Sequence, residues 1–287
     1  MNDRIAPAPF IIGAPRSGTT LLRLMLDSHP ELAIPGETHF LFDVFANPEA
    51  QSLDANLFAD QLTRHFTWPD YGVGEMEFRQ ALLSLDPFAV GAGLRLFYTM
   101  YAARFGKSRW GEKTPDYSQI LPEIKRALPE AHFIYLIRDG RDVAVSKRPL
   151  WFGAGPDIEA QAHDWVDHVE TARRLADGCR DYMEIRYEHL VRAPERTLRA
   201  VCAFLALPYS AEMLDYPRRA EERVLEAGSW FTLGIPAKQL KQLHVKTASP
   251  PAEDRVGRWR TELTQDEATA FEAIAGETLR SCGYDVS

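Results

Sequence analysis

The chain contains few cysteines, and their spacing excludes the common zinc motifs. Only three of the 287 residues are cysteine, Cys179, Cys202 and Cys282, and no two of them lie close together in the sequence. A small, odd and scattered set of this kind predicts reduced thiols buried in a cytoplasmic protein rather than a disulfide framework.

Long apolar runs are also absent. No stretch of about 18 apolar residues is present that would cross a membrane. The segment Met1–Pro7 lacks the apolar core of a signal peptide. The sequence therefore predicts a cytoplasmic protein without a membrane span.

The chain has no excess of positive charge. Its 33 lysines and arginines stand against 41 aspartates and glutamates, which gives a net charge of −8 at pH 7. This balance argues against a nucleic-acid partner, although a local basic cluster can still hold a small anion. With 45% hydrophobic and 26% charged residues the composition is that of a soluble globular protein, long enough for one large α/β domain or two small ones.

Strand-like and helical runs alternate along the chain. Strands are predicted at residues 10–12, 32–34, 109–111, 132–137 and 182–187. Helices are predicted at 19–28, 56–66, 75–85, 92–105, 118–128, 141–148, 157–177, 194–206 and, after the capping box of Thr264 and Glu267, up to Gly283. The alternation predicts an α/β fold with a parallel β-sheet flanked by helices, whose ligands bind at the carboxyl ends of the strands.

The loop after the first strand is the most informative part of the sequence. It is bounded by Gly13 and Gly18, and Thr19 and Thr20 then begin a helix. Glycines let a backbone approach an anion, and the free N–H groups at a helix start point at it, so this layout is typical of a phosphate cradle. It nearly matches the kinase pattern Gly-x4-Gly-Lys-Ser/Thr, but Thr19 replaces the lysine and Arg16 lies inside the loop. The plainer interpretation is a β–α turn that needs glycine only for its backbone.

A second candidate anion site follows the strand at 132–137. Arg138 comes directly off this strand, and Ser146 lies eight residues further on in the following helix. Both side chains could reach one anion at the carboxyl end of the strand. The alternative is a charged surface cluster capped by aspartates.

Two further segments offer groups for proton transfer and charge stabilisation. Glu37 follows the strand at 32–34 and is a candidate general base, with His39 as the competing candidate. Lys113 ends a strand-like piece and could stabilise a developing oxyanion. Their alternatives are a carboxylate at a helix start, a buried histidine and a solvated lysine.

Together, these segments resemble the sulfotransferases that use 3′-phosphoadenosine 5′-phosphosulfate (PAPS). In that family a strand–loop–helix reading Pro-Arg-Ser-Gly-Thr-Thr holds the 5′-phosphosulfate, and residues 15–20 match it without a mismatch. An arginine after a strand, with a serine eight residues on, holds the 3′-phosphate, and Arg138 and Ser146 match this motif. The resemblance covers residues from about 8 to 206.

The match is closest to the tyrosylprotein and bacterial branch of the family. In that branch the helix runs through a Leu-Asp-x-His-Pro stretch to a Gly-Glu-x-Thr or Glu-Glu-Thr segment, and Leu26–Pro30 and Gly36–Thr38 follow this path. The resemblance makes Glu37 the catalytic base and Lys113 the catalytic lysine. It implies a P-loop NTPase-like single domain, residues 1–287, with a mostly helical insertion at about 41–108 and a closing segment at about 240–262.

The reaction implied is in-line transfer of a sulfuryl group from PAPS to an acceptor hydroxyl, leaving adenosine 3′,5′-bisphosphate and using no metal. The catalytic residues implied are Glu37, Lys113 and Arg16. The donor-binding residues implied are Arg16, Ser17, Gly18, Thr19, Thr20, Arg138, Ser146, Tyr187 and Arg258, the last two from segments that contact the nucleotide and close over the 3′-phosphate.

Two other classes of function stay open at the level of sequence. One is a P-loop kinase of a small molecule, which the missing loop lysine argues against. The other is a catalytically inactive nucleotide-binding module, which Glu37 and Lys113 argue against. The acceptor is open among a small molecule, a sugar, a lipid and a peptidyl tyrosine. Aromatic residues within 41–108, 149–180 and 210–250 are expected partly to line its site, and a homodimer is one option for the oligomeric state.

Overall fold

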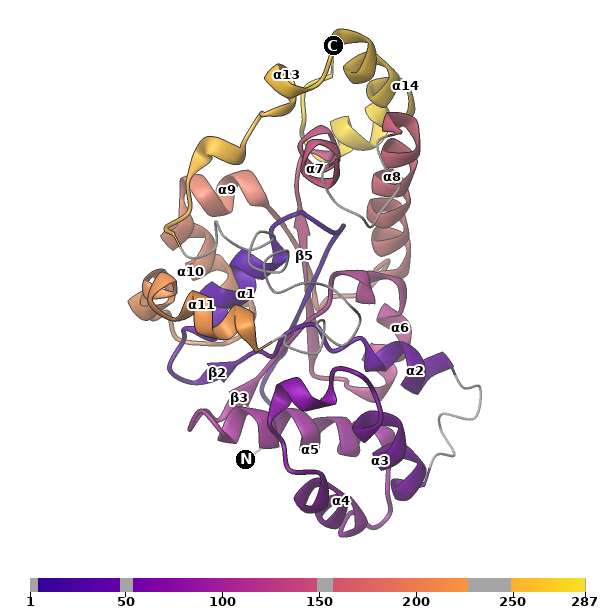
Figure 1. The fold of residues 1–287 in the computed structure, drawn as a ribbon, viewed down its shortest axis with the longest axis vertical. Helices are drawn as coiled ribbons and strands as arrows, with labels where there is room; N and C mark the ends of the chain where they lie inside the picture. The colour runs from indigo at the N-terminus through magenta and orange to yellow at the C-terminus, as the bar shows by residue number, and fades with distance from the viewer. Residues whose placement is uncertain (1–4, 47–53, 149–156, 227–248, 287) are drawn as a thin grey trace.

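A parallel sheet lies at the centre of the molecule, with helices on both of its faces (Figure 1). The computed structural model describes residues 5–46, 54–148, 157–226 and 249–286. The sheet has the strand order β4-β1-β5-β6, formed by Glu112–Lys113, Ala8–Ile12, Ala131–Ile137 and Tyr182–Arg186. The predicted α/β fold with a parallel sheet flanked by helices is confirmed.

The segment around Gly111 joins this sheet to a second one. Strand β2 (Leu32–Ala33) pairs in parallel with β3 (Arg109–Trp110), and β4 begins directly after Gly111. A Cβ atom at Gly111 would lie 2.7 Å from the Pro9 side chain, so only glycine fits where the chain changes partner from β2 to β1. The single strand expected at 109–111 is therefore two short strands with different partners.

The alternation of side chains along β1 and β5 divides the core in two. Phe133 and Tyr135 point into one apolar cluster, whereas Ile134 and Leu136 point into the other. All four side chains are buried, which explains the almost continuous apolar run that predicted this strand.

Different helices cover the two faces. The cluster around Ile134 is closed by α1 (Thr19–Asp27), α9 (Tyr187–Arg192), α10 (Pro194–Phe204) and α11 (Pro217–Leu225). The cluster around Phe133 is closed by α6 (Leu121–Ala127), α7 (Gly140–Lys147), α8 (Ile158–Leu175) and α14 (Gln265–Ser281). Helices α9 and α11 were not predicted, and the strand expected up to Tyr187 ends at Arg186.

The expected helical insertion lies at the lower end of the molecule in Figure 1. It contains α2 (Phe40–Ala46), α3 (Ala55–Thr63), α4 (Glu75–Leu83) and α5 (Val90–Ala103). The last three confirm the helices predicted there, and α2 was missed. Helix α13 (Trp259–Glu262) lies within the expected closing segment, whose residues 240–248 are outside the described part of the chain, as are residues 149–156 and 227–248 of the expected acceptor regions.

The strand ends bring the candidate residues to one edge of the sheet. Strand β1 leads into the glycine loop, β4 ends at Lys113, β5 ends directly before Arg138, and α9 begins with Tyr187 directly after β6. Since all these strands are parallel, their carboxyl ends meet at the same edge.

Candidate active site

The glycine loop is held tightly against β5 and α9. Gly13 has φ +153°, and a Cβ atom there would lie 2.6 Å from the carbonyl oxygen of Leu136. Gly18 has φ +100°, and its Cβ would lie 2.6 Å from the ring of Tyr187. Both glycines are therefore required by close approach as well as by backbone conformation. Tyr187 consequently forms part of the wall of the loop.

A buried polar group of the loop has no hydrogen-bond partner among the described residues. Ser17 is 1% exposed, and its Oγ has no hydrogen-bond partner among the described residues. Gly18 caps α1 without a side chain, and the first turn of α1, which begins with Thr19 and Thr20, contains no acidic residue. A buried hydroxyl beside the positive end of a helix is suited to an anion.

Two arginines from distant parts of the chain meet at this loop. The Nη1 of Arg138 donates to the carbonyl oxygen of Arg16 at 3.1 Å, and the Nε of Arg16 donates to Ser146 Oγ at 3.4 Å. The guanidinium of Arg138 lies over the ring of Tyr187, 4.7 Å from its centre. The Nε of Arg138 is buried without a partner in the described part of the chain. The structure thus brings the glycine loop together with Arg138, Ser146 and Tyr187.

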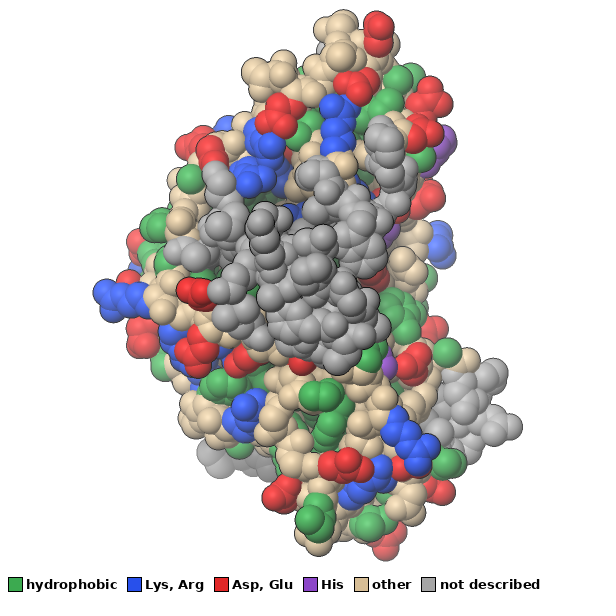
Figure 2. All heavy atoms as spheres, in the orientation of Figure 1, with side chains coloured by type: hydrophobic (Ala, Val, Ile, Leu, Met, Phe, Trp, Pro, Cys, Tyr) green, Lys and Arg blue, Asp and Glu red, His purple; other side chains and the backbone are tan. Residues whose placement is uncertain are grey.

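A third arginine, Arg255, completes the cluster. Its carbonyl oxygen accepts a hydrogen bond from Arg138 Nη2 at 2.7 Å. Burial and, after it, the positive charges of Arg138 and Arg255 together lower the pKa of Arg16 to about 10, whereas Glu37 acts in the opposite direction. Figure 2 shows the local concentration of basic side chains between α9 and α13 on this face, despite the negative net charge of the chain.

Arg258, the residue expected from the resemblance, lies in the same segment but is otherwise engaged. Its guanidinium forms two hydrogen bonds with Glu262, of 2.7 and 2.9 Å. Arg255, three residues earlier, is the one whose charge acts on Arg16. Sequence reasoning missed Arg255 because this segment contains several arginines, and their spacing does not indicate which of them faces the loop. A role for Arg258 in donor binding stays a prediction.

Glu37 and Lys113 form an ion pair at the edge of the cluster. Lys113 Nζ donates to Glu37 Oε1, and His39 Nε2 lies 3.2 Å from Glu37 Oε2. Lys113 is 3% exposed, and burial lowers the pKa of its ammonium group, although Glu37 opposes this. Burial alone would raise the pKa of Glu37, but Lys113 and His39 outweigh it and hold the pKa well below its ordinary value. His39 therefore contacts the carboxylate with which it was expected to compete.

Within the described ranges, no group of three or more His, Cys, Asp or Glu residues is arranged to hold a metal ion. Over the same residues, no helix combines the length and apolar character needed to cross a membrane.

Comparison with known proteins agrees with this geometry. The sequence profile of the sulfotransferase family matches residues 7–211. A putative protein-tyrosine sulfotransferase of Caenorhabditis briggsae is 29% identical over 217 residues, covering 72% of this chain and 68% of the relative. The nodulation protein NoeE of Sinorhizobium fredii is 28% identical over 317 residues, covering 100% of this chain and 69% of the relative.

A solved structure shares the fold. The sulfotransferase domain from the curacin biosynthetic pathway superposes with a TM-score of 0.65 at 20% identity, covering 99% of this chain and 100% of that domain. The family profile spans all strands of the sheet and all of the candidate residues except those of the C-terminal segment. The chain belongs to the sulfotransferase family.

Proposed function

We propose that this enzyme transfers a sulfuryl group from PAPS to the hydroxyl group of an acceptor and releases adenosine 3′,5′-bisphosphate. The observation that carries the proposal is the cluster of Arg16, Arg138 and Arg255 around a tight glycine loop. Three guanidinium groups held near one another are stabilised by a ligand with several negative charges. PAPS carries negative charges at its 5′-phosphosulfate and at its 3′-phosphate, so it can be held by two groups of residues on the protein.

The residues present fit this donor. Ser17 Oγ and Arg138 Nε are buried polar atoms without partners among the described residues, and Gly18 leaves no room for a side chain. In the proposed complex Arg16, Ser17, Gly18, Thr19 and Thr20 hold the 5′ side of the donor. The residues proposed for the 3′-phosphate and nucleotide are Arg138, Ser146, Tyr187 and Arg255, with Arg258 as an additional candidate.

The donor, when bound, supplies the sulfuryl group, and the protein supplies the base. Glu37 is ionised because its pKa is held low, so it can accept the proton of the acceptor hydroxyl. The contact with Lys113 makes Glu37 a weak base, however. We infer that Lys113 leaves Glu37 to stabilise negative charge on the donor together with Arg16, which raises the pKa of Glu37 when the donor is bound.

The proposed reaction uses no metal. A sulfuryl group carries less negative charge than a γ-phosphoryl group, so the fixed charges of Arg16 and Lys113 can take the place that a metal has in a kinase. Turnover in the presence of EDTA should therefore equal turnover with added magnesium. A requirement for magnesium would remove this part of the proposal.

Ligand-dependent melting tests the choice of donor. A ligand at about 100 times its Kd adds roughly 2.7 kcal/mol of stability. Adenosine 3′,5′-bisphosphate should raise the melting temperature clearly, and 5′-AMP should raise it less. A rise with Mg-ATP and none with the bisphosphate would instead indicate a kinase.

Transfer of label tests the reaction itself. Because several relatives are named protein-tyrosine sulfotransferases, phenolic hydroxyls are the first acceptors to try. Incubation of the enzyme with ³⁵S-labelled PAPS and either a tyrosine-containing peptide or p-nitrophenol should give a labelled acceptor. Sugars and lipids with free hydroxyls form the second panel. The cytoplasmic location and the homodimer stay predictions, which fractionation of cells and light scattering can test.

A further inference from the structure

A buried carboxylate that the proposed reaction does not use lies next to the catalytic lysine. Glu112 precedes Lys113 in β4 and is 0% exposed. Successive residues of a strand point to opposite sides, so Lys113 faces Glu37 while Glu112 shares its side with Thr114. Burying a carboxylate is costly unless hydrogen bonds satisfy it, so its presence inside the protein calls for a reason.

Hydroxyl groups satisfy both oxygens of Glu112. Tyr98, from α5, donates to Oε2 at 2.7 Å, and Thr114 Oγ1 donates to Oε1 at 2.8 Å. Burial outweighs the opposing effects of the Tyr98, Thr114 and Thr38 side chains and of the charge of Lys113, so the pKa of Glu112 is raised to about 7. The two hydroxyl groups differ in the further hydrogen bonds that they make.

The hydroxyl of Thr114 continues to the loop that carries the base. Its oxygen accepts a hydrogen bond of 3.0 Å from the backbone N–H of Thr38. Thr38 is 0% exposed and lies between Glu37 and His39, whose side chains contact each other. The hydroxyl of Thr114 therefore connects the strand of the catalytic lysine to the backbone of the loop that carries the catalytic base.

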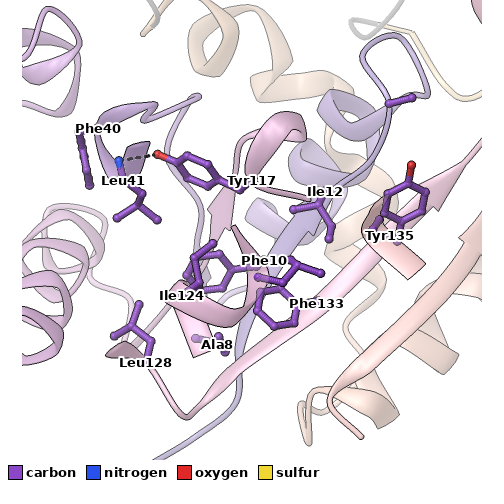
Figure 3. Packing of buried hydrophobic residues seen from close by; sticks show 14 of the residues in the cluster. Ala8, Phe10, Ile12, Phe40, Leu41, Tyr117, Ile124, Leu128, Phe133 and Tyr135 are labelled. Carbon is purple, nitrogen blue, oxygen red and sulfur yellow. Dashed lines mark hydrogen bonds between the residues drawn. The ribbon is translucent and has the colours of Figure 1, made fainter. Parts of the chain in front are cut away.

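Other hydroxyls hold the same loop from the opposite side. Thr38 Oγ1 and the Tyr117 hydroxyl lie 2.8 Å apart, and Tyr117 also accepts a hydrogen bond from the backbone N–H of Leu41. Figure 3 shows Tyr117 and Leu41 facing each other across this bond. The carbonyl oxygen of Thr38 accepts a bond from Thr67 Oγ1 at 3.0 Å. The loop is thus fixed at its backbone. The side chain of Thr38 also interacts with Glu112 and Tyr98, but the backbone N–H of Thr38 is linked to Glu112 through Thr114.

A threonine hydroxyl carries one proton, and this decides the role of Glu112. Because that proton is given to Glu112, the lone pairs of Thr114 Oγ1 face the N–H of Thr38. An apolar residue at position 112 would leave the proton without its acceptor and the hydroxyl free to rotate. The amide of Thr38 would then lose a well-aligned partner.

We propose that Glu112 is a positioning residue for the pair of Glu37 and Lys113, acting through the hydroxyl of Thr114 on the backbone of Thr38. This role rests on the proposed sulfuryl transfer, because it concerns the geometry of its base. Glu112 contacts neither donor nor acceptor in this proposal. Its removal should therefore change the rate of the chemical step and leave donor binding intact.

Two matched variants separate positioning from packing. Thr114→Val and Tyr98→Phe each remove one hydroxyl that donates to Glu112. Both hydroxyls also contact Thr38, but Tyr98 meets its side chain, and only Thr114→Val removes the partner of its backbone N–H. A displacement of about 1 Å in an active site can lower a rate about 100-fold, so Thr114→Val should lower kcat by about 10- to 100-fold. The KM of Thr114→Val for PAPS should stay within about twofold of wild type. The kcat of Tyr98→Phe should also stay within about twofold of wild type. Equal losses of kcat in both variants, or full kcat in Thr114→Val, would overturn the proposal.

Conservative replacement of Glu112 provides a rescue test. Glu112→Gln keeps an oxygen that can accept from Thr114, whereas Glu112→Met removes the acceptor. Glu112→Gln should keep most of kcat, and Glu112→Met should lose as much as Thr114→Val. In the double variant of Glu112→Met and Thr114→Val the losses should not add, because both cut the same link. Additive losses, or a Glu112→Gln variant as slow as Glu112→Met, would count against the link.

A readout independent of chemistry separates this proposal from the proposed function. Hydrogen exchange of the Thr38 amide reports the bond to Thr114 directly. Exchange should be faster in Thr114→Val than in wild type and unchanged in Tyr98→Phe, whether or not the enzyme transfers sulfate. Binding of adenosine 3′,5′-bisphosphate to each variant verifies that it is folded. A wild-type enzyme without transfer activity would refute the proposed function, whereas unchanged Thr38 exchange in Thr114→Val would refute the link.

Discussion

Lys113 donates a hydrogen bond to Glu37, so the negative charge of the proposed base is balanced by the lysine that is proposed to stabilise charge on the donor. The pair lies close enough to the arginine cluster for the charge of Glu37 to act on Arg16. In the proposed complex, a multiply charged donor bound at Arg16 would compete with Glu37 for the ammonium group of Lys113. We infer that the resting ion pair keeps the base weak until a donor is present, and several measurements follow from this inference.

Replacing Lys113 should raise the pKa of Glu37. In Lys113→Met the principal charge that lowers this pKa is gone, while the burial that raises it remains. Titration of ¹³C-labelled glutamate carboxyl groups should show one resonance moving from well below the ordinary range into or above it. Turnover should fall by about 10²–10³-fold, the usual cost of one lost stabilising group at a developing charge. An unchanged titration would mean that Lys113 does not set the state of Glu37.

Replacing the base should slow the reaction and spare binding. Glu37→Gln should lower kcat by about 10²–10⁴-fold, the range contributed by general base catalysis. Affinity for adenosine 3′,5′-bisphosphate should stay close to that of wild type. His39→Gln is the matched control, since it removes the imidazole ring whose Nε2 lies 3.2 Å from Glu37 Oε2. A larger loss in His39→Gln than in Glu37→Gln would assign the base to His39.

Two arginines of one segment should differ in their effect on donor binding. Arg255 acts on Arg16 and lies beside Arg138, whereas Arg258 is bound to Glu262. A charged hydrogen bond contributes about 1.5–3 kcal/mol, so Arg255→Met should weaken binding of the bisphosphate about 10- to 100-fold. Arg258→Met should change it by less than about threefold, as expected of an exposed ion pair. Calorimetric titration of both variants decides between them, and the reverse order would restore Arg258 as the donor ligand.

The sequence alone predicted those parts of the site that belong to local sequence motifs. The glycine loop and Arg138 directly follow strand ends, and Ser146 lies in the helix that follows β5, while parallel strands bring their carboxyl ends together. Arg255 could not be found in this way, because contacts from α7 place its segment. Asp142 accepts hydrogen bonds from the backbone N–H groups of Gly257 and Trp259, at 2.7 and 2.9 Å, and no periodicity encodes such a contact.

The hydrogen bonds around Glu112 were missed for a similar reason. The sequence places Glu112 in a charged stretch with Lys113, which is equally consistent with a solvated turn. Its burial depends on α5, which supplies Tyr98, and on the loop of Thr38, which is 76 residues away from Thr114. Likewise, only the close approach of Pro9 to Gly111 explains why one expected strand is divided in two. Tertiary contacts of this range are invisible to local patterns.

The stability of the protein should fall as the pH rises through the titration of Glu112. Its pKa is about 7 in the folded protein against an ordinary value of 4.5, so the folded state binds more protons than the unfolded state between these values. The free energy of unfolding therefore falls with rising pH in this window, by an amount on the order of a few kcal/mol, and levels off above it. Glu112→Gln removes this titration, so urea unfolding at pH 5 and pH 8 should give a smaller loss than in wild type. Glu77→Gln, which removes an exposed carboxylate, should behave like wild type. An equal loss in wild type and Glu112→Gln would mean that this carboxyl group does not titrate in the folded protein as described.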